Sequence, residues 1–62
     1  MNLFAARVDK DLTQKELGRR VGVGQSTVAD WERGAYLPSL MRFREVCVIL
    51  EISPSKILDV KT

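Results

Sequence analysis

Length, composition and charge predict a small, compact domain. The chain has 62 residues, of which 45% are hydrophobic and 29% charged, and its formal net charge is +2 at pH 7. This size supports one small core, so we expect residues 1–62 to form a single domain. The charge is weak evidence for a nucleic-acid partner, because each half of the sequence carries five Lys or Arg and four Asp or Glu residues.

The residue types exclude several kinds of catalytic and metal site. The chain has no histidine and a single cysteine, so it offers neither a His-based triad nor a cluster of zinc ligands. Gly22-Val23-Gly24 begins like a dinucleotide-binding fingerprint, but Thr27 stands where the third glycine belongs. We therefore predict no enzyme activity, no metal, no cofactor and no small-molecule substrate.

The sequence also gives expectations about the compartment. No stretch approaches the roughly 18 apolar residues of a membrane span, and the first residues lack the basic start and long apolar run of a signal peptide. Cys47 lies in an apolar run, where we expect a buried filler, and a lone buried thiol suits a reducing compartment. We expect a cytoplasmic protein with no membrane partner.

The first predicted helix covers residues 2–10. Leu3 and Ala6 are expected to face inward, with Arg7 on the same side. Asp11 follows at a turn position, and Asp tolerates the left-handed conformation better than most residues.

The second predicted helix begins after Thr13. Thr13 is a typical N-cap, and Glu16 completes a capping box three residues later. Gly22 ends the helix, because glycine adopts the left-handed conformation without a steric cost. Gly18 lies beside the apolar face, where we expect a neighbouring helix to approach closely.

A third helix is predicted to start at Gln25 and to stop at Gly34. Gly24 is its permissive N-cap, and Val28 and Trp31 form its inward face. Together with the preceding helix it makes two short helices joined by a sharp turn, an arrangement that fits a helix into the major groove of DNA.

The C-terminal half predicts two more helices. Ser39 follows Pro38 as the N-cap of a helix over residues 40–50, whose apolar residues recur at three- and four-residue steps. This predicted inward stripe consists of Leu40, Phe43, Val46, Cys47 and Leu50. Ser53 is expected to cap a last short helix with Pro54 at its first position. The residues expected to seal the core there are Ile52, Ile57 and Leu58. The predicted fold is all-α, with five short helices and no strand.

The spacing of these residues resembles the helix-turn-helix domains of the lambdoid phage repressor and Cro family, also called XRE-like regulators. The residues that carry the resemblance are Leu12–Leu17, Gly18, Gly22, Trp31–Gly34, Pro38–Leu40 and the stretch from Ile52 to Leu58. The resemblance covers nearly the whole chain and implies a lambda-repressor-like DNA-binding domain with helices 2 and 3 as the helix-turn-helix. It implies a transcriptional regulator, specifically a repressor, that binds double-stranded DNA.

Two kinds of DNA contact are expected. Gln25 is the main candidate for the base edges, because a Gln amide can bond adenine N7 and N6 together. Gln14 is the main candidate for phosphate, a role that the matching Gln has in the family. Lys15 and Arg33 are further candidates for backbone contact. The other residues assigned to the DNA interface are Gly24, Ser26, Thr27, Ala29 and Asp30. Of these, Thr27 can offer either its hydroxyl to a phosphate or its methyl group to the packing.

Two structural expectations complete the hypothesis. Glu32 lies near the C-terminus of its helix, the unfavourable end for a negative charge, and the resemblance implies a salt bridge from Arg7 to Glu32. Three apolar residues fall off the inward stripe of the 40–50 helix and predict a homodimer contact: Met41, Val48 and Ile49. A homodimer implies a palindromic operator. The alternative is an antitoxin-type or protein-interaction module of the same fold, whose main partner is another protein.

Overall fold

The computed structural model describes residues 3–52, which form four α-helices and no strand. The helices are α1 (Leu3–Asp9), α2 (Gln14–Val21), α3 (Gln25–Arg33) and α4 (Leu40–Leu50). The all-α prediction is confirmed for these residues. The fifth predicted helix, which begins after Ser53, and its core residues Ile57 and Leu58 lie outside the described residues.

The helices end where local sequence signals predict. The Thr13 hydroxyl accepts from the Glu16 amide at 3.0 Å, and the Glu16 side chain reaches back to the Thr13 amide, which completes the capping box. Gly22 closes α2 in the left-handed conformation at φ 90°. Ser39 caps α4 by accepting from the Arg42 amide. Asp11 adopts φ 57° in the turn between α1 and α2, as expected for that position.

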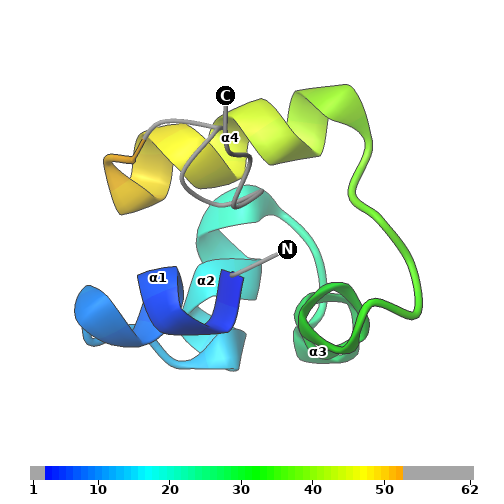
Figure 1. Ribbon diagram of the computed structural model, residues 1–62, viewed down its shortest axis with the longest axis horizontal. Coiled ribbons are helices and arrows are strands. Elements are labelled where there is room, and N and C mark those ends of the chain that lie inside the picture. The colour runs from blue at the N-terminus through cyan, green and yellow to red at the C-terminus, as the bar shows by residue number, and fades with distance from the viewer. Residues whose placement is uncertain (1–2, 53–62) are drawn as a thin grey trace, which may run out of the picture.

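The four helices surround one apolar core (Figure 1). α2 packs against both α3 and α4, and α1 packs against α3. α4 lies across the C-terminal end of α2, where the Arg42 Nη1 donates to the Val21 carbonyl at 2.7 Å. The buried apolar residues are Leu3, Leu12, Leu17, Val21, Val28, Trp31, Val46, Cys47 and Leu50. The core therefore ties both helices of the predicted helix-turn-helix to α1 and α4.

The prediction that Leu40 belongs to the inward stripe of α4 is wrong. Leu40 is 77% exposed, whereas Val46, Cys47 and Leu50 are buried and Phe43 is partly buried. Leu40 is the first residue of α4 and lies at the edge of the stripe, so no neighbouring helix covers it. Within residues 3–52, no helix has the length and apolar character that crossing a bilayer requires.

Candidate nucleic-acid interface

The turn between α2 and α3 brings the two helices into close contact at Gly18. An added Cβ at Gly18 would lie 2.7 Å from the Val23 carbonyl oxygen and 3.2 Å from that of Gly24. Glycine is needed here because the backbone of the turn and of Gly24, the N-cap of α3, lies against α2, so the predicted close approach occurs at the start of the neighbouring helix. The amides of Gly22 and Val23 both donate to the Gly18 carbonyl at 2.8 Å. The start of α3 is thereby fixed relative to α2.

α3 presents one solvent-facing side and one packed side. Val28 and Trp31 are buried against the core, with exposures of 0% and 4%. At 3.6 residues per turn, the residues opposite them fall on one continuous face. Gln25, Ser26 and Arg33 are exposed there, and Ala29 and Asp30 are half-buried. Five of the predicted DNA-interface residues therefore share one face of α3.

Two other predicted interface residues lie apart from that face. Thr27 is half-buried and falls on the side of α3 that carries Trp31. Its helical position favours packing over contact with a groove. Gly24 is exposed at the N-cap of α3, with no side-chain cap, so the first amides of α3 remain without a side-chain acceptor.

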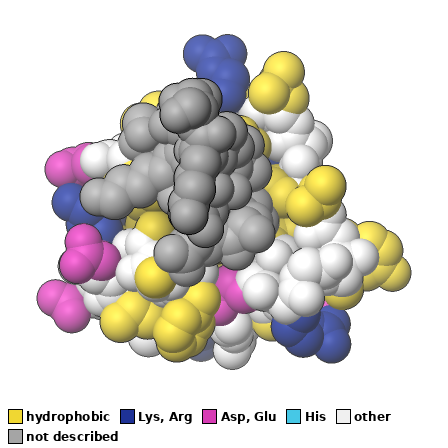
Figure 2. Space-filling view, in the orientation of Figure 1, with side chains coloured by type: hydrophobic (Ala, Val, Ile, Leu, Met, Phe, Trp, Pro, Cys, Tyr) yellow, Lys and Arg dark blue, Asp and Glu magenta, His cyan; other side chains and the backbone are white. Residues whose placement is uncertain are grey.

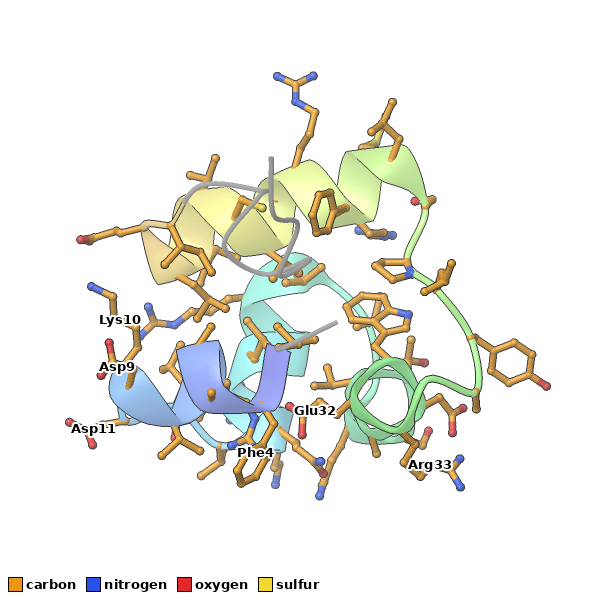
Figure 3. All side chains as sticks on the ribbon, viewed as in Figure 1. Phe4, Asp9, Lys10, Asp11, Glu32 and Arg33 are labelled. Atoms are coloured by element: carbon orange, nitrogen blue, oxygen red, sulfur yellow. The ribbon has the colours of Figure 1, made fainter. Side chains whose placement is uncertain are left out.

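Asp30 and Arg33 form an ion pair along the outward face of α3. The Arg33 side chain is 68% exposed and that of Asp30 is 28% exposed. The carboxylate of Asp30 compensates the charge of Arg33 in the absence of DNA. Figure 3 shows Arg33 on the outer side of α3, pointing away from Glu32.

Arg7 and Glu32 form a buried, two-point ion pair between α1 and α3. The Arg7 Nε donates to Glu32 Oε2 at 2.6 Å, and Nη2 donates to Oε1 at 3.2 Å. The side chains are only 10% and 7% exposed. The remaining Arg7 nitrogen, Nη1, donates to the Leu12 carbonyl at 2.7 Å, and the guanidinium carbon lies 5.2 Å from the centroid of the Phe4 ring.

Gln14 joins this pair, which the sequence did not reveal. Its Nε2 donates to Glu32 Oε1 at 3.0 Å. The side chain predicted to bind phosphate is thus held at the N-terminus of α2 by a residue near the C-terminus of α3. Figure 3 shows the Glu32 side chain between α1 and α3. Its carboxylate accepts from both Arg7 and Gln14. The sequence predicted a cationic partner for Glu32 from the helix macrodipole. It gave no local signal for the contact with Gln14, which lies 18 positions away.

Other basic side chains lie at different places on the surface. Lys15 is exposed near the N-terminus of α2 and makes no ion pair with another described residue. Arg20 and Arg44 border a shallow groove at the other end of α2, beside α4. Lys10 is paired with Glu51 at 3.3 Å. Lys15 is therefore the basic residue closest in sequence to Gln14 that has no described ion-pair partner.

The three residues predicted to form a dimer contact all line the same groove on α4. Met41 and Val48 are 72% and 76% exposed. Ile49 is partly buried and packs against the core, because it lies at the edge of the inward stripe beside Val46. A second exposed apolar region that the sequence analysis missed follows α3, where Tyr36 and Leu37 are 68% and 76% exposed. Figure 2 shows hydrophobic side chains on the right of the view, where the segment between α3 and α4 lies in Figure 1.

Among residues 3–52, no group of three or more His, Cys, Asp or Glu side chains could hold a metal ion. Cys47 is a free, buried cysteine, and its burial raises the pKa of the thiol.

Two comparisons with known proteins bear on this geometry. Residues 3–57 match the family model described as Helix-turn-helix. A comparison with curated proteins found no match.

Proposed function

This chain belongs to the helix-turn-helix family of DNA-binding regulators, and from that premise we propose that it is a sequence-specific repressor whose α3 enters the major groove of double-stranded DNA. The observation that carries the proposal is the polar, exposed start of α3. Gln25 and Ser26 are accessible, while Val28 and Trp31 anchor the opposite side of the helix in the core. A helix held in this way can present its first residues to base edges.

Gln25 is the proposed base-reading residue, since its amide can both donate to and accept from an adenine edge. Ser26 and Ala29 lie beside it and supply a hydroxyl and a methyl group. Asp30 can accept from cytosine N4 but is paired with Arg33 in the free protein. Thr27 contributes mainly to packing, which its half-burial supports.

Phosphate contacts would come from the N-terminal ends of α2 and α3. The first amides of a helix lack intrahelical acceptors and favour anions. Gln14 and Lys15 begin α2, and Gly24 precedes α3 without a Cβ that could obstruct an approaching phosphate. Arg33 is a further phosphate contact in this scheme, provided that it leaves Asp30.

A homodimer on a palindromic operator is the proposed assembly. Met41 and Val48 give α4 an exposed apolar strip, and Ile49 lies at its edge. Two such domains would place their α3 helices roughly 34 Å apart, one turn of DNA. The proposed unit is a single cytoplasmic domain of residues 1–62.

The alternative is an antitoxin-type or protein-interaction module, whose main partner is another protein. The observation that favours it is the same exposed groove on α4, because an apolar surface can bind another protein as well as a second copy of this chain. An interaction module would not need the polar start of α3. Salt-dependent retention on generic DNA separates the two functions.

Selection of bound sites from a random DNA library tests the proposal. We expect an approximate palindrome with two half-sites. Gln25→Ala should weaken binding to the selected site by about 1–3 kcal/mol and relax the preference at one base pair in each half-site. Arg33→Ala should instead weaken all sequences alike and lower the salt slope by roughly one. Equal loss on specific and unrelated DNA for Gln25→Ala, with base preference intact, would reject α3 as the reading helix.

A further inference from the structure

The Gln14 side chain is fixed by a hydrogen bond to another residue of the domain. Its Nε2 donates to Glu32 Oε1 at 3.0 Å, and the Glu32 side chain is only 7% exposed. A primary amide carries two hydrogens on nitrogen. One of them is taken by Glu32, and the other remains at the N-terminus of α2, beside backbone amides that have no intrahelical acceptor.

The charge of Glu32 would by itself oppose a nearby phosphate. Arg7 removes this obstacle, because it neutralises the carboxylate through two hydrogen bonds, at 2.6 Å and 3.2 Å. Arg7 is in turn held by the Leu12 carbonyl. The pair therefore offers Gln14 a fixed acceptor with no net charge, built from residues on α1 and α3.

We infer that Glu32 is a positioning residue for DNA binding, which acts by orienting the Gln14 amide toward the phosphate backbone. This inference rests on the proposed function. Glu32 does not touch DNA in this scheme, because it is buried. It links the C-terminal end of the reading helix to the phosphate contact at the start of α2, so that the two helices present their contacts in a fixed register.

The expected effect follows from side-chain ordering. Immobilising a flexible side chain on binding lowers the affinity by roughly two- to tenfold, because the side chain loses conformational entropy. A Gln14 side chain that is already held avoids much of this cost. Removing its anchor should therefore lower DNA affinity by about that factor, although no DNA contact is deleted.

Glu32→Ala alone is unsuitable for the test, because it leaves the buried Arg7 without its carboxylate and can unfold the domain. Arg7→Met combined with Glu32→Met removes both charges and replaces them with side chains of similar length. Such a replacement of a buried ion pair is often neutral for stability. The matched control is Lys10→Met with Glu51→Met, which removes an exposed ion pair and also leaves the net charge unchanged.

Affinity is measured on the site selected from the random library, with the folded fraction of each variant confirmed by circular dichroism. We expect the Arg7/Glu32 double variant to bind about two- to tenfold more weakly, and the Lys10/Glu51 control to bind like the wild type. In a Gln14→Ala background, the Arg7/Glu32 replacement should cause no further loss. Nitrogen-15 relaxation of the Gln14 side-chain amide in the free protein should show a rigid group that becomes mobile in the Arg7/Glu32 variant.

The outcomes separate this inference from the proposed function. If Gln14→Ala weakens binding but the Arg7/Glu32 variant binds fully, or if the losses are additive, Glu32 does not act through Gln14. A Gln14 amide that is mobile in the free wild-type protein would also overturn the inference. If Gln14→Ala has no effect, the inference fails while reading by Gln25 stands. If the wild type selects no site, the proposed function fails as well.

Discussion

Glu32→Ala should strongly destabilise this fold. It removes the acceptor of two Arg7 hydrogen bonds and of the Gln14 amide. Arg7 is 8% exposed, so its charge would stay buried without a carboxylate. Three helices lose a shared contact, since these residues lie on α1, α2 and α3.

The magnitude follows from this burial. Removing one partner of a buried ion pair costs about 3–5 kcal/mol. We expect a loss near the lower limit, about 3 kcal/mol, because Arg7 retains the Leu12 carbonyl and the Phe4 ring. A domain of this size has a total stability of only about 3–9 kcal/mol. At roughly 4–8 °C for each kcal/mol, Tm should fall by about 12–24 °C.

Thermal and urea unfolding followed by circular dichroism measure this loss. Glu45→Ala is the control, since it breaks the Arg42–Glu45 pair, whose side chains are both 40% exposed. Solvent screens that pair, so its loss should cost no more than about 0.5 kcal/mol. A Glu32→Ala domain that melts within the range of the Glu45→Ala control would refute the assignment of a stabilising role to the buried pair.

Three further substitutions and probes test other features of the structure. Gly18→Ala should destabilise the domain by about 2 kcal/mol in urea unfolding, because its Cβ would lie 2.7 Å from the Val23 oxygen; unchanged or raised stability would contradict the close approach. Asp30→Asn should strengthen binding to unrelated DNA and raise the salt slope by roughly one, because it frees Arg33 and removes a negative charge; an unchanged slope would show that Arg33 does not reach phosphate. Cys47 should react with a thiol reagent much more slowly in the folded protein than in urea, since burial raises its pKa and limits access; equal rates would show that the thiol is exposed.

Local rules predicted the helices well because their ends depend on nearby residues. The Thr13–Glu16 capping box, the left-handed Gly22 and the Ser39 cap are each determined within a few positions. α4 also ends at Leu50 as predicted, although its left-handed C-cap is Glu51, which carries no glycine signal. There the Ile52 amide donates to the Cys47 carbonyl, which closes the helix without glycine.

Contacts between distant residues limited the sequence-based account. The pattern could not show that the turn backbone lies against Gly18, or that Gln14 shares Glu32 with Arg7. It also placed Leu40 in the core, because periodicity assigns a face to a residue without showing whether another helix extends far enough to cover it. In each case the missing information is the relative position of two helices.

The division of α3 into two faces has a consequence for how the protein can change its DNA preference. Val28, Trp31 and Glu32 hold the helix through the core and the buried ion pair, so substitutions there should alter stability and DNA binding together. Gln25 and Ser26 are exposed and make no described side-chain hydrogen bond within the domain. If α3 reads bases as proposed, substitutions at these two positions should therefore change base preference with little effect on stability, since surface changes away from packed contacts typically fall within about 0.5 kcal/mol. In this fold, the residues that place the reading helix are separate from those proposed to read the bases.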